Sequence, residues 1–98
     1  MEFAMKIPEE MRKKYTERRA RDAEALSEAL EAGDFETLSR LGHQLKGNAA
    51  TFGYESLAEV GRKLESAAET KSIESGKQCL FSLKAWLQEQ TSGVGEDG

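Results

Sequence analysis

Apolar side chains recur at helical spacing in four segments of this chain, and this pattern excludes most folds. An α-helix turns about 100° per residue, so residues three or four positions apart share a face. The four predicted helices span residues 8–32, 35–52, 55–69 and 72–90. Their apolar stripes are formed by Met11, Tyr15, Ala23, Leu26 and Leu30; by Phe35, Leu38, Leu41, Leu45, Ala49 and Phe52; by Leu57, Val60, Leu64 and Ala68; and by Ile73, Leu80, Leu83 and Leu87. Because the connections are short, the sequence predicts an all-α fold, an antiparallel up-and-down four-helix bundle.

Several residues at the ends of these segments favour helix boundaries there. Pro8 suits the first turn of a helix, and Asp34 is a typical N-cap residue. Gly33 and Gly53 follow the first two segments, where glycine commonly ends a helix. The first two helices are therefore predicted with defined ends.

The 98 residues suffice for one domain, which we expect over residues 8–90. Residues 1–7 are expected to form a flexible segment that could include cloning-derived residues, because Met5 is a plausible second start. Residues 91–98, TSGVGEDG, are Gly-rich and acidic, and we expect them to form a disordered tail.

Charge and cysteine usage narrow the classes of partner and cellular setting. A formal net charge of −4 argues against nucleic acid as the main partner. Cys79 is the only cysteine, so neither an internal disulfide nor a thiolate metal cluster can form. The apolar runs are short and interrupted by charges, so neither a transmembrane helix nor a secretory signal is predicted. We expect a cytoplasmic monomer that does not bind membranes.

The only histidine, His43, is predicted on the helical face opposite the apolar stripe of its segment. At about 100° per residue it lies roughly 140° from Leu38. Gly47 follows one turn later on the same outer face, and Lys46 brings a cation to its edge. Exposed helix positions usually carry good helix formers, and glycine costs about 1 kcal/mol relative to alanine. The sequence thus gives up helix stability beside an exposed histidine.

Few reactions are open to a lone exposed histidine. No Ser or Cys is evidently placed for activation by His43, so a hydrolytic triad is not indicated. No second histidine or nearby cysteine offers zinc ligands, and no glycine-rich phosphate loop follows a strand. The imidazole itself can accept a phosphoryl group near neutral pH, with Lys46 offsetting the added charge. The residues alone leave open whether His43 is such an acceptor or an ordinary solvated histidine.

The stretch HQLKGNAATFG, residues 43–53, resembles the His-x-x-Lys-Gly-x-x-x-x-x-Gly signature of histidine-containing phosphotransfer (HPt) domains. The flanking sequences EALEAGDFETLSRLG and YESLAEVGRKLE are also similar to this family, and the likeness covers residues 8–90. The resemblance implies that His43 is the phosphoacceptor and that Lys46 supports the phosphoryl group. It also implies that Gly47 lets the active site of a partner close over the histidine.

The resemblance also bears on Glu65 and Gly42. Many family members carry a Gln or Glu about twenty-two residues after the histidine, which orients its ring, and Glu65 occupies this position here. An ordinary surface glutamate is the alternative for Glu65. Gly42 stands where family members often have alanine; it is expected either to loosen the helix or to permit close helix packing.

The resemblance implies a relay in two-component signalling. His43 would reversibly exchange a phosphoryl group with aspartates of response-regulator receiver domains, and a sensor or hybrid histidine kinase would also be a partner. The receiver would supply Mg²⁺, so no cofactor or metal site is expected in this chain, nor any kinase or phosphatase activity. The docking surface is expected around Ser39, His43, Gly47 and Ala50, with Tyr54 as an exposed apolar neighbour.

Two other interpretations stay open. One is a helical adaptor bundle that binds a partner helix and carries no phosphate, in which His43 is dispensable. The other is an HPt module that belongs to a larger sensor kinase, which a catalytic ATP-binding domain elsewhere in the gene would reveal.

Overall fold

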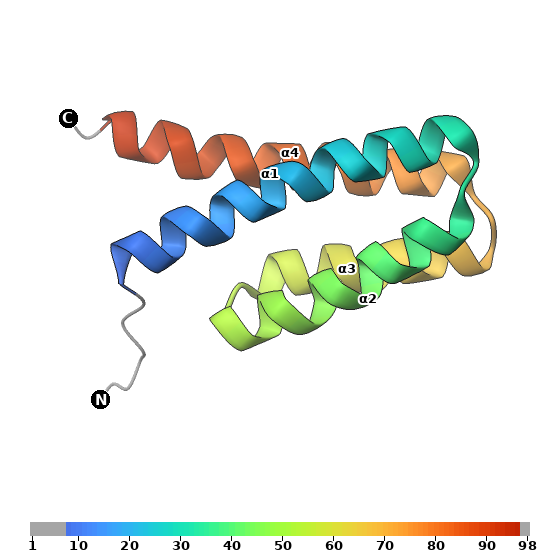
Figure 1. The fold of residues 1–98 in the computed structure, drawn as a ribbon, viewed down its shortest axis with the longest axis horizontal. Helices are drawn as coiled ribbons and strands as arrows, with labels where there is room; N and C mark the ends of the chain where they lie inside the picture. Colours follow the sequence, from blue (N-terminus) through green and yellow to red (C-terminus); the bar gives the residue numbers. More distant parts are fainter. Residues whose placement is uncertain (1–7, 97–98) are drawn as a thin grey trace.

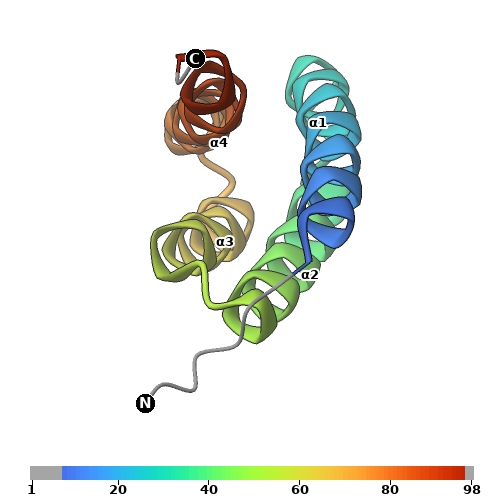
Figure 2. The same ribbon diagram turned by 90° about the vertical axis from the view of Figure 1, so that its left-hand side faces the viewer.

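The structure, a computed structural model, describes the backbone of residues 8–96 and the side chains of residues 8–90; the predicted flexible segment 1–7 lies outside this range, as do residues 97–98. It contains four α-helices, which are α1 (Glu9–Ala32), α2 (Phe35–Phe52), α3 (Glu55–Glu69) and α4 (Ile73–Glu96). Consecutive helices run in opposite directions (Figure 1). Seen from the end of the bundle, they form a ring in chain order (Figure 2), with α1 packed against α2 and α4, and α3 against the same two helices. The predicted antiparallel up-and-down four-helix bundle is confirmed.

Local interactions define both ends of α2, the helix that carries the histidine. Gly33 and Gly53 have φ angles of 67° and 81°, in the left-handed region that glycine enters without steric cost. Asp34 Oδ1 accepts a hydrogen bond from the backbone N–H of Thr37 at 3.1 Å. The Thr37 hydroxyl donates to Asp34 Oδ2 at 2.6 Å. Thr37 thus closes the first turn, although the Glu or Gln of a full capping box is missing.

The last helix is longer than the sequence predicted. We expected an end near Gln90 and a disordered tail over residues 91–98, whereas the backbone is helical to Glu96. Gly93 and Gly95, the two glycines in the helical part of this stretch, weaken a helix by about 1 kcal/mol each but do not block it as proline does. Extending an existing helix is also easier than starting one. Among the described residues, no helix is long and apolar enough to cross a membrane.

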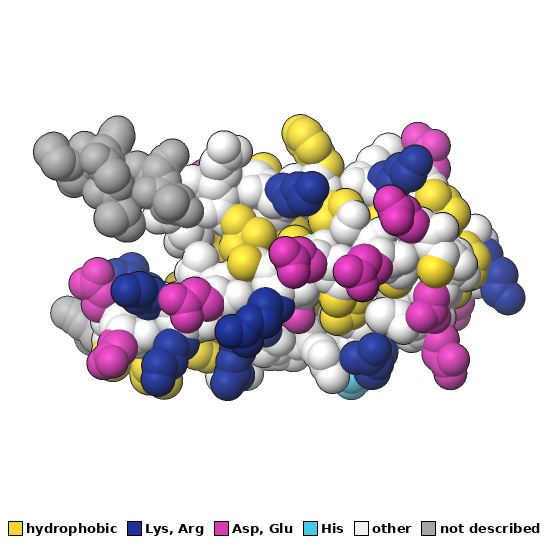
Figure 3. All heavy atoms as spheres, turned by 45° about the horizontal axis from the view of Figure 1, so that its top comes forward, with side chains coloured by type: hydrophobic (Ala, Val, Ile, Leu, Met, Phe, Trp, Pro, Cys, Tyr) yellow, Lys and Arg dark blue, Asp and Glu magenta, His cyan; other side chains and the backbone are white. Residues whose placement is uncertain are grey.

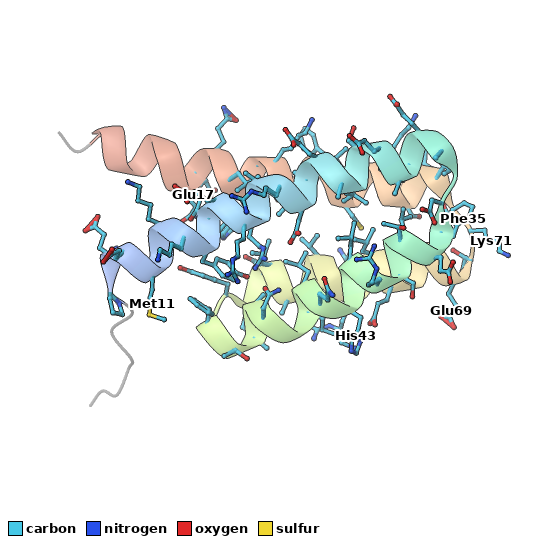
Figure 4. All side chains as sticks on the ribbon, viewed as in Figure 1. Met11, Glu17, Phe35, His43, Glu69 and Lys71 are labelled. Carbon is cyan, nitrogen blue, oxygen red and sulfur yellow. The ribbon has the colours of Figure 1, made fainter. Side chains whose placement is uncertain are left out.

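Apolar stripes from all four helices meet in one core. Its most deeply buried large side chains, all predicted, are Leu26, Leu38, Leu57, Leu64 and Leu83. Met11, which was also predicted in the stripe of α1, is 50% exposed. The first turns of α1 project beyond the ends of α2 and α3, so Met11 has little to pack against (Figures 1 and 4). The buried hydrophobic residues that the predicted stripes missed are mostly small, and they are Ala29, Ala58, Ala67, Cys79 and Trp86.

An aromatic cluster fastens α1 to the end of α2. The ring of Tyr15 stacks on Phe52 with 4.5 Å between centroids and meets Trp86 edge-on at 5.9 Å. The Tyr15 hydroxyl donates to Asn48 Oδ1 at 2.7 Å, and burial raises the pKa of this hydroxyl. Tyr54 completes the cluster and is half-buried, so the prediction of an exposed Tyr54 was wrong. Its ring packs inward because the turn after α2 brings it between Tyr15 and Trp86.

Removing a core leucine from α2 tests this packing. Leu38 is 0% exposed, so Leu38→Ala should lower the free energy of unfolding by about 2–5 kcal/mol through lost burial and a residual cavity. Phe81→Ala is the control, because Phe81 is 75% exposed and its loss should change stability by no more than about 0.5 kcal/mol. Urea denaturation measures both. Equal effects of the two substitutions would contradict the core described above.

Candidate functional site

His43 projects from α2 into solvent. Its side chain is 74% exposed, and it points away from α1 and α4 (Figure 4). In the space-filling view it appears at the border of the molecule, beside a basic side chain (Figure 3). Ser39, Gly47 and Ala50 are exposed as well, so the predicted outer face of small residues around His43 is confirmed.

Glu65 on α3 joins two side chains of α2. Its Oε2 lies 3.1 Å from His43 Nδ1, and its Oε1 lies 2.9 Å from Lys46 Nζ. A carboxylate only accepts hydrogen bonds, so the Nδ1 of the ring must carry the proton and donate it. This tautomer leaves the lone pair of the neutral imidazole on Nε2. No hydrogen bond to Nε2 is found within residues 8–90. The contact is thus the one expected of a residue that orients the ring.

The charges at this site stabilise the ionised form of Glu65. The hydrogen bond from Lys46 lowers the pKa of Glu65 most, and the hydrogen bond from His43 lowers it further, while partial burial opposes them. Glu65 is therefore ionised at neutral pH and keeps an acceptor oxygen for each partner. Lys46 is 37% exposed on its side chain, which leaves its ammonium accessible from solvent as well as from Glu65.

Gly47 lies in open space. A Cβ built at this position would meet nothing within 4 Å. Its backbone has ordinary helical geometry, since the glycines with positive φ in the described chain are Gly33 and Gly53. The Gly47 carbonyl accepts a hydrogen bond from Thr51 Oγ1 at 3.1 Å. Neither backbone conformation nor packing within residues 8–90 therefore requires glycine at position 47.

Gly42, in contrast, is buried against α3. A Cβ at this position would lie 2.8 Å from the backbone nitrogen of Glu65, closer than real Cβ atoms approach a backbone. Of the two expectations for Gly42, close helix packing is confirmed. The glycine immediately before the histidine thus faces the helix that carries Glu65.

Arg40 also belongs to the site, although the sequence analysis did not single it out. It lines a shallow pocket together with Ser39, His43 and Glu65. Its position three residues before His43 is the helical spacing that would have predicted this. A separate groove between α3 and α4 is lined by Cys79 and Phe81 among others and includes neither His43 nor Lys46. Within the described chain, no cluster of three or more His, Cys, Asp or Glu side chains could hold a metal ion.

Comparison with known proteins identifies the family. A family model described as the Hpt domain matches residues 10–92. This range includes all of α2 and α3 and nearly all of α1. No curated protein and no solved structure matches the chain. Hpt domains are phosphotransfer modules and are neither kinases nor phosphatases. The chain therefore belongs to the Hpt domain family, which has a phosphotransfer role in two-component signalling.

Proposed function

We propose that this chain is a phosphorelay intermediate in which His43 reversibly accepts a phosphoryl group from receiver aspartates and donates it to them. Its partners are response-regulator receiver domains and a sensor or hybrid histidine kinase. The observation that supports the proposal most is the Glu65–Nδ1 contact at 3.1 Å on a ring that is 74% exposed. An ordinary solvated histidine has no need of a carboxylate from another helix that selects its tautomer.

The proposed transfer is an in-line displacement at phosphorus. The Nε2 lone pair of His43 forms a bond to the phosphorus of an aspartyl phosphate, and the bond from phosphorus to the aspartyl oxygen breaks. The aspartate leaves as a carboxylate, and the ring gains a positive charge. Because Glu65 accepts the Nδ1–H bond, it stabilises this charge while it holds the ring in place. Attack of the carboxylate on phosphohistidine reverses each step.

Lys46 supports the phosphoryl group in this scheme. Its ammonium pairs with Glu65 at 2.9 Å, close to the ring that gains the phosphate. Charge-assisted hydrogen bonds to phosphoryl oxygens are stronger than neutral ones. We further propose that Mg²⁺ comes from the receiver domain, and that this chain has no kinase or phosphatase activity of its own.

The docking surface proposed for the receiver is the exposed face of small residues on α2. Ser39, Gly47 and Ala50 flank His43 there and offer little bulk to a partner that must approach the ring closely. Arg40 lies at the same pocket, where it offers a cation beside the carboxylates of Asp34 and Glu36. Tyr54 is not part of this surface, because its ring packs in the aromatic cluster.

Replacing the histidine separates a relay from an adaptor. His43→Gln should abolish phosphate acceptance from a panel of phosphorylated receiver domains, because no other side chain offers the imidazole nucleophile. Because the side chain is exposed, stability should change by no more than about 0.5 kcal/mol. The wild-type product should be acid-labile and base-stable. A His43→Gln protein that still accepts phosphate would refute His43 as the acceptor. A wild-type protein that accepts no phosphate from any receiver would favour the adaptor bundle.

Lys46→Ala should slow phosphotransfer and shorten the lifetime of phosphohistidine. It should also raise the pKa of Glu65, because the hydrogen bond that lowers it most is removed. A carboxyl group whose pKa is lower in the folded protein than in the unfolded chain stabilises the fold when the pH is above the unfolded-state pKa. This stabilisation is lost as the pH falls through the folded-state pKa. In Lys46→Ala, protonation of Glu65 at acidic pH should therefore lower the free energy of unfolding by less than it does in the wild-type protein. Carbon-13 NMR of the Glu65 carboxyl and transfer rates measure these effects.

The control is Lys84→Ala, because Lys84 is an exposed lysine on α4, away from His43. If the two variants behave alike, Lys46 is only a surface charge.

Gly47→Gln should separate stability from function. A helix interior favours almost any residue over glycine, so the free energy of unfolding should rise by up to about 1 kcal/mol. The new side chain leans back toward His43, since helical side chains tilt toward the N-terminus. We expect transfer to slow at least tenfold, and a loss of about 1.4 kcal/mol in transition-state binding is enough for a tenfold effect. The transfer rate of Gly47→Ala should lie between those of the wild-type protein and Gly47→Gln. Thermal unfolding and transfer rates on one preparation decide this, and undiminished transfer by a stabilised protein would show that Gly47 does not control access.

A further inference from the structure

The helices α2 and α3 touch backbone to backbone at two buried glycines. A Cβ at Gly61 would lie 2.5 Å from the nitrogen and 2.8 Å from the Cα of Lys46. A Cβ at Gly42 would lie 2.9 Å from the carbonyl oxygen of Gly61. Non-bonded carbon atoms are separated by about 3.5–4.0 Å at ordinary contact. Any larger residue at either position would therefore force the helices apart or distort them.

Local backbone conformation does not explain these glycines. In the described chain, positive φ occurs at Gly33, Gly53 and Lys71, so Gly42 and Gly61 have ordinary helical geometry. Each glycine costs the helix about 1 kcal/mol relative to alanine. Ala58, also buried on α3, shows that this helix accommodates alanine elsewhere in its interface. What the two glycines provide is the short distance between α2 and α3.

This distance determines what Glu65 can reach. Glu65 follows Gly61 by one helical turn, so the close approach at Gly61 also brings the backbone of Glu65 against α2. A Cβ at Gly42 would come within 3.1 Å of the Cγ of Glu65, so Gly42 leaves the space that the glutamate side chain occupies. From there its two oxygens contact His43 Nδ1 and Lys46 Nζ at 3.1 and 2.9 Å.

We propose that Gly42 and Gly61 are positioning residues of the phosphotransfer site, which hold α3 so close to α2 that one carboxylate contacts both His43 and Lys46. This inference rests on the proposed function of His43. Moving the Gly61 contact from 2.5 Å to about 3.5 Å shifts α3 by about 1 Å. A donor and an acceptor that are about 3.6 Å or more apart do not form a hydrogen bond. Glu65 would then lose at least one partner.

The test compares Gly61→Ala with Gly76→Ala. Gly76 is also buried, but a Cβ there would meet the ends of two side chains, Leu30 at 2.5 Å and Leu38 at 3.3 Å, and no backbone atom. We expect Gly61→Ala to move the titration of the Glu65 carboxyl toward its ordinary pKa, as measured by carbon-13 NMR. It should also slow phosphotransfer about tenfold, the lower end of the loss that follows when the residues orienting metal-bound histidines are mutated. Gly76→Ala should leave both measurements as in wild type, whatever stability it loses.

Each outcome bears on the proposal. Gly61→Ala that keeps the wild-type titration of Glu65, or that shifts the titration without slowing transfer, overturns it. If Gly61→Ala does not fold, Gly42→Ala replaces it, because its Cβ would meet Glu65 N at 2.8 Å, and the same two measurements apply. A wild-type protein that accepts no phosphate would refute the proposed function itself. If the wild-type protein accepts phosphate and the glycine variants match it in both measurements, only the positioning role is refuted.

Discussion

The carboxylate of Glu65 links α2 and α3 through one contact to His43 and one to Lys46, at 3.1 and 2.9 Å. These contacts give the exposed imidazole a defined tautomer, which an isolated surface histidine lacks. They also require that two helices meet at a fixed distance and rotation. The four-helix bundle supplies this, because its core leucines hold the helices while the histidine remains outside. The proposed chemistry thus depends on packing that lies beneath the exposed His43 side chain.

Much of the site could be predicted from the sequence because its signals are local. The exposed face of His43, the flank position of Lys46 and the open space at Gly47 all follow from helical periodicity within one segment. Helix ends followed from residues with known capping chemistry, including Asp34 and Gly53. The exception is α4, whose glycines suggested a tail while its backbone stays helical to Glu96. Glycine ends a helix where it adopts a left-handed conformation, as Gly33 and Gly53 do, whereas glycines with helical geometry only weaken it.

Contacts between helices could not be predicted in the same way. Glu65 entered the site only through the family resemblance, because residues twenty-two positions apart share no local pattern. Gly61 was missed altogether, since its role depends on what it faces on α2. Tyr54 was expected on the docking surface as an exposed apolar neighbour, whereas its ring packs against Tyr15 and Trp86. These errors concern the register between helices, which a single sequence does not encode in any one segment.

Glycine has two opposite uses within this small region. At position 47 it faces solvent, where no neighbour limits a larger residue. At positions 42 and 61 it is buried, where backbone atoms of the facing helix leave no room for a Cβ. The first use lowers helix stability without any return inside the described bundle, which supports the proposal that Gly47 serves the approach of a partner. The second lowers helix propensity while it permits close packing, so its reason lies within the fold. The same residue type therefore leaves open space on the outer face of α2 at position 47 and brings α3 close to α2 at positions 42 and 61.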